Sequence, residues 1–180
     1  MSFGFDDECE EIEDAIDDAL EAGKLIIAAA SNSGGVSGRT RPARQDGVIC
    51  MHATDGLGNK GGMNPSPLPK DHNFATLGVA VPLDWDGEKV WKSGTSFATP
   101  IAAGFVAGVL ELVKYRCGKL SRRQSKLLRR KQGMGAILKK MAEERDGYDF
   151  IYPDRLARDW SDEKAVTAAA KSIESILADI

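Results

Sequence analysis

The chain has 180 residues, of which 42% are hydrophobic, and its formal net charge is −3 at pH 7. This length suits one ordinary domain with its own hydrophobic core, and the charge gives no indication of nucleic-acid binding. The first residues, MSFGFDDECEE, contain neither a basic n-region nor an apolar h-region. We therefore expect no signal peptide and a cytoplasmic location.

Cys9, Cys50 and Cys117 are widely spaced and odd in number. Their spacing matches neither a disulfide framework nor a zinc site. We expect reduced thiols, with Cys50 as a small core residue, and neither a metal nor a cofactor.

The pattern of the first third predicts a parallel α/β sheet. Residues 6–22 carry apolar side chains at helical spacing, and Gly23 is a plausible end for that helix. The apolar run 24–30 (KLIIAAA) then predicts a strand that is buried on both faces. A second buried strand is expected at 47–53 (GVICMHA), and 54–73 is predicted to be irregular surface.

The most apolar stretch, 97–113, is interrupted by Thr99, Pro100 and Glu111. It is shorter than the roughly 20 residues of a membrane span, so a buried core helix is expected and no membrane contact. Beyond Gly118 the chain is basic over 119–131. The usual explanation for this run and for the acidic run at 6–21 is a solvated helix face, and the alternatives are a docking surface or contact between the two runs.

Two further helices are predicted in the last third, at 134–144 and 161–179, with a Tyr-rich turn (GYDFIYP) between them. The domain organisation that we expect is a main domain over 1–155, followed by a C-terminal helical extension over 156–180.

Asn32 lies in a small-residue loop that directly follows the buried strand 24–30. Open α/β sheets place their ligand crevice at the carboxyl ends of their strands. An Asn amide at that position can donate a hydrogen bond to a developing oxyanion. The alternative is an Asn that serves only the geometry of the turn.

Ser96 lies in the segment SGTSFATP at the start of the long apolar helix. The first backbone N–H groups of a helix have no partner within it, and the helix dipole favours negative charge there. A hydroxyl at that position can therefore act beside an anion-binding site. The alternative is that Ser96 or Thr95 is simply the N-cap of the helix.

Four segments in this order resemble the subtilisin-like serine protease (subtilase) family. GTSFATP resembles the signature around the family's active serine, and AAASNSGG resembles the strand and loop that carry its oxyanion asparagine. PAR…GVICMHATD and GMGAILKKMA…GYDFIYP resemble later segments of the family. The resemblance covers about residues 12–153 and implies a partial subtilisin-like three-layer α/β fold with a parallel sheet. We expect this chain to supply two or three strands of that sheet, from which the N-terminal strands are missing.

The resemblance also implies roles for individual residues. Ser96 would be the nucleophile that attacks a peptide or protein substrate, and Asn32 with the backbone N–H of Ser96 would hold the oxyanion. Ala30, Ser31 and Gly34 would line the primary specificity pocket.

The other two members of a catalytic triad are not found in the sequence. In subtilisins the triad runs Asp, His, Ser along the chain, so both partners should precede Asn32. That part of the chain contains no histidine and no Asp-Thr/Ser-Gly or His-Gly-Thr motif. His52 and His72 lie downstream, where an ordinary core or surface role is expected for each.

Two hypotheses follow. The first is a subtilisin-like serine endopeptidase of which this chain is a fragment that lacks the triad Asp and His, and which needs its missing N-terminal half or a partner chain. The alternative is a non-catalytic, degenerate protease module that acts in binding or fold complementation. A lipase or esterase is disfavoured because such enzymes carry the serine in G-x-S-x-G, and here the motif reads GTSFA.

Overall fold

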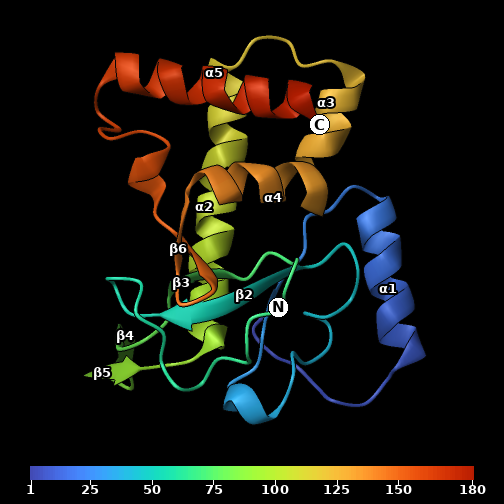
Figure 1. The fold of residues 1–180 in the computed structure, drawn as a ribbon, viewed down its shortest axis with the longest axis vertical. Coiled ribbons are helices and arrows are strands. Elements are labelled where there is room, and N and C mark those ends of the chain that lie inside the picture. Colours follow the sequence, from blue (N-terminus) through green and yellow to red (C-terminus); the bar gives the residue numbers. More distant parts are fainter.

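The computed structural model describes residues 1–180, apart from the side chain of Val36. A five-stranded sheet in the order β1-β2-β3-β7-β6 lies at its centre, with helices around it (Figure 1). The α/β class with a mostly parallel sheet is therefore confirmed. The parallel strands are β1 (Ile27–Ala29), β2 (Ile49–Thr54), β3 (Phe74–Leu77) and β7 (Tyr148–Ile151), and β6 (Ala142–Arg145) pairs antiparallel with β7.

The long helix α2 (Thr95–Arg116) covers one face of the sheet. Met51 and Ala53 of β2 share a hydrophobic core with Ala102 and Val106 of α2. Length and composition alone would also let α2 cross a bilayer, which is true of no other helix among the described residues. In this structure α2 packs against β1, β2, β3 and α5 (Glu163–Asp179).

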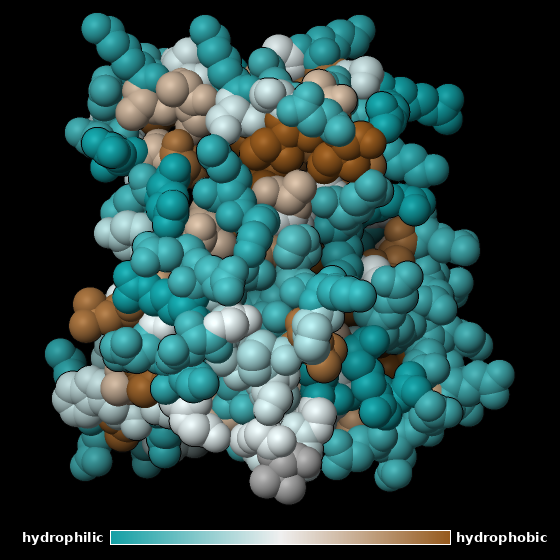
Figure 2. All heavy atoms as spheres, in the orientation of Figure 1, coloured by the Kyte–Doolittle hydropathy of each residue, from teal (hydrophilic) through white to brown (hydrophobic). Residues whose placement is uncertain are grey.

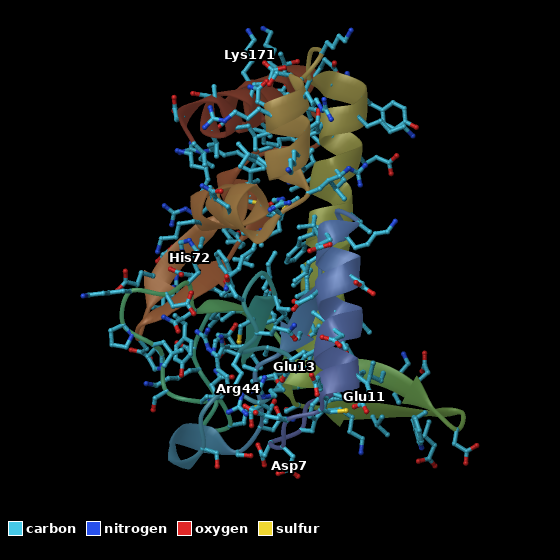
Figure 3. The ribbon with its side chains drawn as sticks, turned by 90° about the vertical axis from the view of Figure 1, so that its right-hand side faces the viewer. Asp7, Glu11, Glu13, Arg44, His72 and Lys171 are labelled. Carbon is cyan, nitrogen blue, oxygen red and sulfur yellow. The ribbon has the colours of Figure 1, made fainter. Side chains whose placement is uncertain are left out.

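Helix α1 (Glu10–Glu21) covers the opposite face near β1, so this part of the molecule has three layers. Ile16 of α1 packs with Ala28 of β1 and Cys50 of β2, which is buried as expected. Acidic side chains lie along the whole of α1, and Figure 3 labels Glu11 and Glu13 near its first turns. Glu13 is paired with Arg41 rather than with the basic run at 119–131.

Helices α3 (Arg122–Leu128), α4 (Lys131–Lys140) and α5 pack against one another and continue the core that α2 begins. Figure 2 shows hydrophobic side chains gathered between α5 and α4. Ile173 and Leu177 of α5 are fully buried in that core. The boundary between a main domain and an extension near residue 155 stays a prediction.

The structure corrects three predictions from sequence. The segment GYDFIYP is not a turn, because Tyr148–Ile151 forms β7 between β3 and β6. The sheet has five strands rather than two or three, and the exposed hairpin of β4 (Val81–Trp85) and β5 (Glu88–Lys92) was not expected. Strand β1 is shorter than residues 24–30 because pairing with β2 begins only at Ile27.

His52 lies fully buried on β2, on the face opposite α2. Its Nδ1 is 2.9 Å from the carbonyl oxygen of Phe74, and its Nε2 has no hydrogen-bond partner among the described residues. Burial lowers the pKa of this imidazole to about 4, and the charge of Arg39 adds to the effect. The hydrogen bond to Phe74 opposes it, as do the charges of Asp71 and Asp149. His52 is therefore a neutral core residue at neutral pH.

We expect Ile173→Ala to lower the free energy of unfolding by about 2–5 kcal/mol, because it leaves a cavity in the core between α5 and α2. Ile176→Ala, on the partly exposed side of α5, is the matched control and should cost clearly less. Urea unfolding followed by circular dichroism measures both. Equal losses would mean that α5 is not packed as described.

His52 should make the protein less stable in mild acid. The unfolded imidazole titrates near 6.5, so between that value and about 4 the unfolded chain binds more protons than the folded one. The free energy of unfolding should therefore fall by about 2 kcal/mol from roughly pH 8 to roughly pH 5. Urea unfolding at the two pH values should show this loss in the wild type and in His72→Gln, but a much smaller one in His52→Gln. An unchanged pH dependence in His52→Gln would contradict the assignment.

Candidate active site

The loop that carries Asn32 begins directly after β1. Ala30 is fully buried and Ser31 is almost fully buried, whereas Asn32 is exposed. Ser31 has a φ of 147°, which is rare for a residue with a side chain, and its Oγ accepts a hydrogen bond of 3.1 Å from the N–H of Ser33. This tight turn brings Asn32 out of the sheet at the carboxyl end of β1.

Gly34 closes the same loop. Its φ is 69°, in the left-handed region that favours glycine, and its N–H donates to the carbonyl of Met63 at 2.9 Å. A Cβ at this position would lie 3.0 Å from the carbonyl oxygen of Gly62. Both the backbone conformation and the close approach to Gly62 therefore require glycine at this position. The hydrogen bond to Met63 joins the loop after β1 to the segment 61–64.

Ser96 is the second residue of α2, and Gly94 is the N-cap. The N–H of Gly94 donates to the carbonyl of Gly78 at 2.8 Å, which fixes the start of the helix at the end of β3. The backbone N–H of Ser96 has no carbonyl one turn earlier in the helix to bind. It is therefore available to an anion, and the dipole of a helix of 22 residues favours negative charge at this end.

Thr95 holds the Asn32 side chain beside the start of α2. The N–H of Thr95 donates to Oδ1 of Asn32 at 2.8 Å, and its hydroxyl is 3.1 Å from the same oxygen. Because a backbone N–H can only donate, the atom that faces it must be the amide oxygen. The NH₂ group of Asn32 is thereby left as a donor, and a Cβ on Gly94 would lie only 3.2 Å from it.

The site thus brings together two of the residues predicted from sequence, Asn32 and Ser96. Asn32 is hydrogen-bonded to Thr95, and Ser96 follows Thr95 in the chain. An amide donor and a free backbone N–H beside a serine hydroxyl can together stabilise an oxyanion formed by attack of that serine. Ala30, Ser31 and Gly34 belong to the loop that positions Asn32. Among the described residues, no group of three or more His, Cys, Asp or Glu side chains is placed to hold a metal ion.

The hydroxyl of Ser96 donates to the backbone carbonyl of Ser2 at 2.8 Å. A carbonyl oxygen can orient the hydroxyl but is far too weak a base to remove its proton. The two histidines have other neighbours: His52 is bonded to Phe74, and His72 lies 3.8 Å from Asp149 of β7 and stacks on Phe74 (Figure 3). In the part of the chain that the structure describes, no imidazole is hydrogen-bonded to Ser96.

Sequence reasoning missed two residues of this site. Thr95 was considered only as a helix cap, although its place between Gly94 and Ser96 in the GTS motif was a usable signal. Ser2 is far from the motif in the chain, and nothing in its own sequence surroundings points to Ser96.

Comparison with solved structures supports the fold. The maturation protease PagA of prenylagaramide aligns with 98% of this chain at a TM-score of 0.67 and 22% identity, and a mutant of the protease domain of PatA aligns with 96% at 0.68 and 21%. The chain spans only 60% and 56% of these two structures.

A curated relative gives the same picture at the level of sequence. A thermostable alkaline protease of Halalkalibacterium halodurans is 37% identical over 117 residues, which are 64% of this chain but 30% of the relative. The model of the subtilase family matches residues 1–152, which include Asn32 and Ser96. The chain therefore belongs to the subtilase family.

Proposed function

We propose that this chain supplies the nucleophile and the oxyanion site of a subtilisin-like serine endopeptidase. The observation that carries the proposal is the pair of hydrogen bonds from Thr95 to Oδ1 of Asn32, because they leave the NH₂ group of Asn32 as a donor beside Gly94, at the end of α2 where Ser96 lies. Family membership adds support, since the family model spans this whole site.

In the proposed reaction, Oγ of Ser96 attacks the carbonyl carbon of a peptide bond in a peptide or protein substrate. The new C–O bond places negative charge on the carbonyl oxygen, which the NH₂ of Asn32 and the N–H of Ser96 hold. The C–N bond then breaks, and the amine leaves with the proton that a base has taken from Ser96. Water hydrolyses the resulting acyl-enzyme by the same steps in reverse.

The base and its carboxylate partner come from outside residues 1–180 in this proposal. Its support is that Ser96 donates to the carbonyl of Ser2 and that both histidines have other neighbours. The chain also spans 60% or less of each protein to which it was compared above. We further propose that the loop of Ala30, Ser31 and Gly34 borders the primary specificity pocket, because it fixes the chain next to Asn32.

The second candidate function is a non-catalytic module derived from a protease. The hydrogen bond from Ser96 to Ser2 favours this candidate. The carbonyl oxygen of Ser2 accepts the hydrogen bond of the Ser96 hydroxyl, but it is too weak a base to remove the proton. The two candidates differ in whether Ser96 reacts once a base is supplied.

Labelling with a fluorophosphonate probe, with and without added imidazole as an external base, separates the candidates. We expect slow labelling of the 180-residue chain in buffer and a rate that rises with imidazole concentration. Ser96→Ala should abolish the imidazole-dependent rate, and Asn32→Leu should lower it by roughly 100- to 1000-fold, a range that belongs to subtilisin itself and is taken over by family likeness.

Ser125→Ala, on the exposed surface of α3, is the matched control and should label like the wild type. Rapid Ser96-dependent labelling without imidazole would contradict the proposed lack of a base. A folded chain that imidazole does not activate would favour the non-catalytic module instead.

A further inference from the structure

A mainly apolar groove of about 540 Å³ lies between α2 and the start of α5. One wall is the part of α2 from Gly104 to Arg116, and Pro153, Trp160 and Val166 contribute to the other. A Cβ built on Gly104 or on Gly108 would meet no atom within 4 Å, so the groove is open above these positions. We call this surface the α2–α5 groove. None of its lining residues belongs to the candidate active site.

Two large aromatic side chains line the α2–α5 groove and are still open to solvent. Tyr115 is 64% exposed and Trp160 is 44% exposed. The Nζ of Lys114 lies 4.5 Å from the ring centroid of Tyr115 and donates to its hydroxyl at 2.8 Å. Beside Trp160, the N–H and the hydroxyl of Ser161 both donate to Oδ1 of Asp159. The surroundings of both rings are therefore held in place, which favours binding of a flat apolar group between fixed aromatic faces.

The hydrogen-bonding groups of the groove restrict the backbone that it can accept. No strand contributes to the lining, so an occupant cannot pair its main chain with an open sheet edge. The lining instead offers side-chain donors, namely the indole N–H of Trp160 and the hydroxyl of Tyr115. An N–H buried there without an acceptor would cost about 1–3 kcal/mol. The best occupant is therefore rich in carbonyl acceptors and poor in N–H donors, and proline has no backbone N–H at all.

The groove also carries one uncompensated negative charge. Glu111 and Arg116 are the charged residues of its lining, and Arg116 is paired with Glu163 of α5. Glu111 is exposed and takes part in no ion pair within the part of the chain that the structure describes. A carboxylate on the wall of an apolar groove favours an occupant with a positive charge at that point.

We propose that the α2–α5 groove binds a proline-rich polypeptide segment of a partner protein, in the polyproline II conformation and with a Lys or Arg beside Glu111. Aromatic-lined grooves are a known means of binding such segments, because the preformed helix loses little entropy and its carbonyls stay available to side-chain donors. The inference goes beyond the proposed function, since the groove shares no residue with the candidate active site. An amphipathic helix is the other occupant that needs no sheet edge, and the experiment distinguishes it.

The test titrates the 180-residue chain into a fluorescein-labelled polyproline peptide of about ten residues with one Arg at its centre, and follows fluorescence anisotropy. We expect saturable binding by the wild type. Trp160→Ala should weaken it by at least about tenfold, because buried aromatic side chains usually dominate the energy of such contacts. Trp91→Ala, on the exposed strand β5, is the matched control and should bind like the wild type. Circular dichroism checks that both variants are folded.

A charge reversal tests the role of Glu111. Glu111→Lys should weaken binding of the Arg peptide and strengthen binding of the same peptide with Glu in place of Arg. Absence of binding by the wild type, or equal affinity of the wild type and Trp160→Ala, would overturn the proposal. Tighter binding of an Ala-rich helical peptide with one Arg would also overturn it, because the groove would then belong to a helix. The readout does not involve Ser96, so a failure here is distinct from a failure of fluorophosphonate labelling.

Discussion

Two hydrogen bonds from Thr95 to the side-chain oxygen of Asn32 tie the end of β1 to the start of α2. The orientation of the Asn32 side chain depends on this junction, which leaves its NH₂ group as a donor beside Gly94. The N–H of Ser96 is unpaired because it lies in the first turn of α2. Strand β2 fixes the relative position of the two elements that meet at this junction, because α2 and β1 both pack against it.

The region around this junction could be predicted from sequence because its patterns are local. The apolar runs of β2 and α2 bury those elements on the sheet, and the small residues around Asn32 and Ser96 permit close backbone approach. β7 could not be predicted from its own residues, since Gly147 and Pro153 flank it like turn signals. Its strand conformation comes from pairing with β3 and β6, which only the tertiary structure supplies.

Thr95 could have been found from its place in the GTS motif, whereas Ser2 could not be found from sequence. Ser2 reaches Ser96 because Met1 pairs with the outer edge of β1, a contact between segments that are far apart in the chain. Outside the site, Arg39 makes contacts of the same kind, since its buried guanidinium bonds to Asp71 and to the side chain of Asn73. Such contacts leave no periodic pattern, so spacing within one segment cannot reveal them. Motifs locate the chemistry of this chain, and its tertiary contacts determine how that chemistry is oriented.

The place of β7 in the sheet also has a consequence for the order in which the molecule can assemble. β7 is made after α2, α3 and α4, yet it pairs with β3, which precedes all three. Contacts between distant segments slow folding because a long loop must close before they form. During synthesis, Ser96 and Asn32 would therefore leave the ribosome well before the sheet beneath them is complete. Until the last strand arrives, β3 would carry an open edge, and the newly made chain would depend on protection from aggregation in that interval.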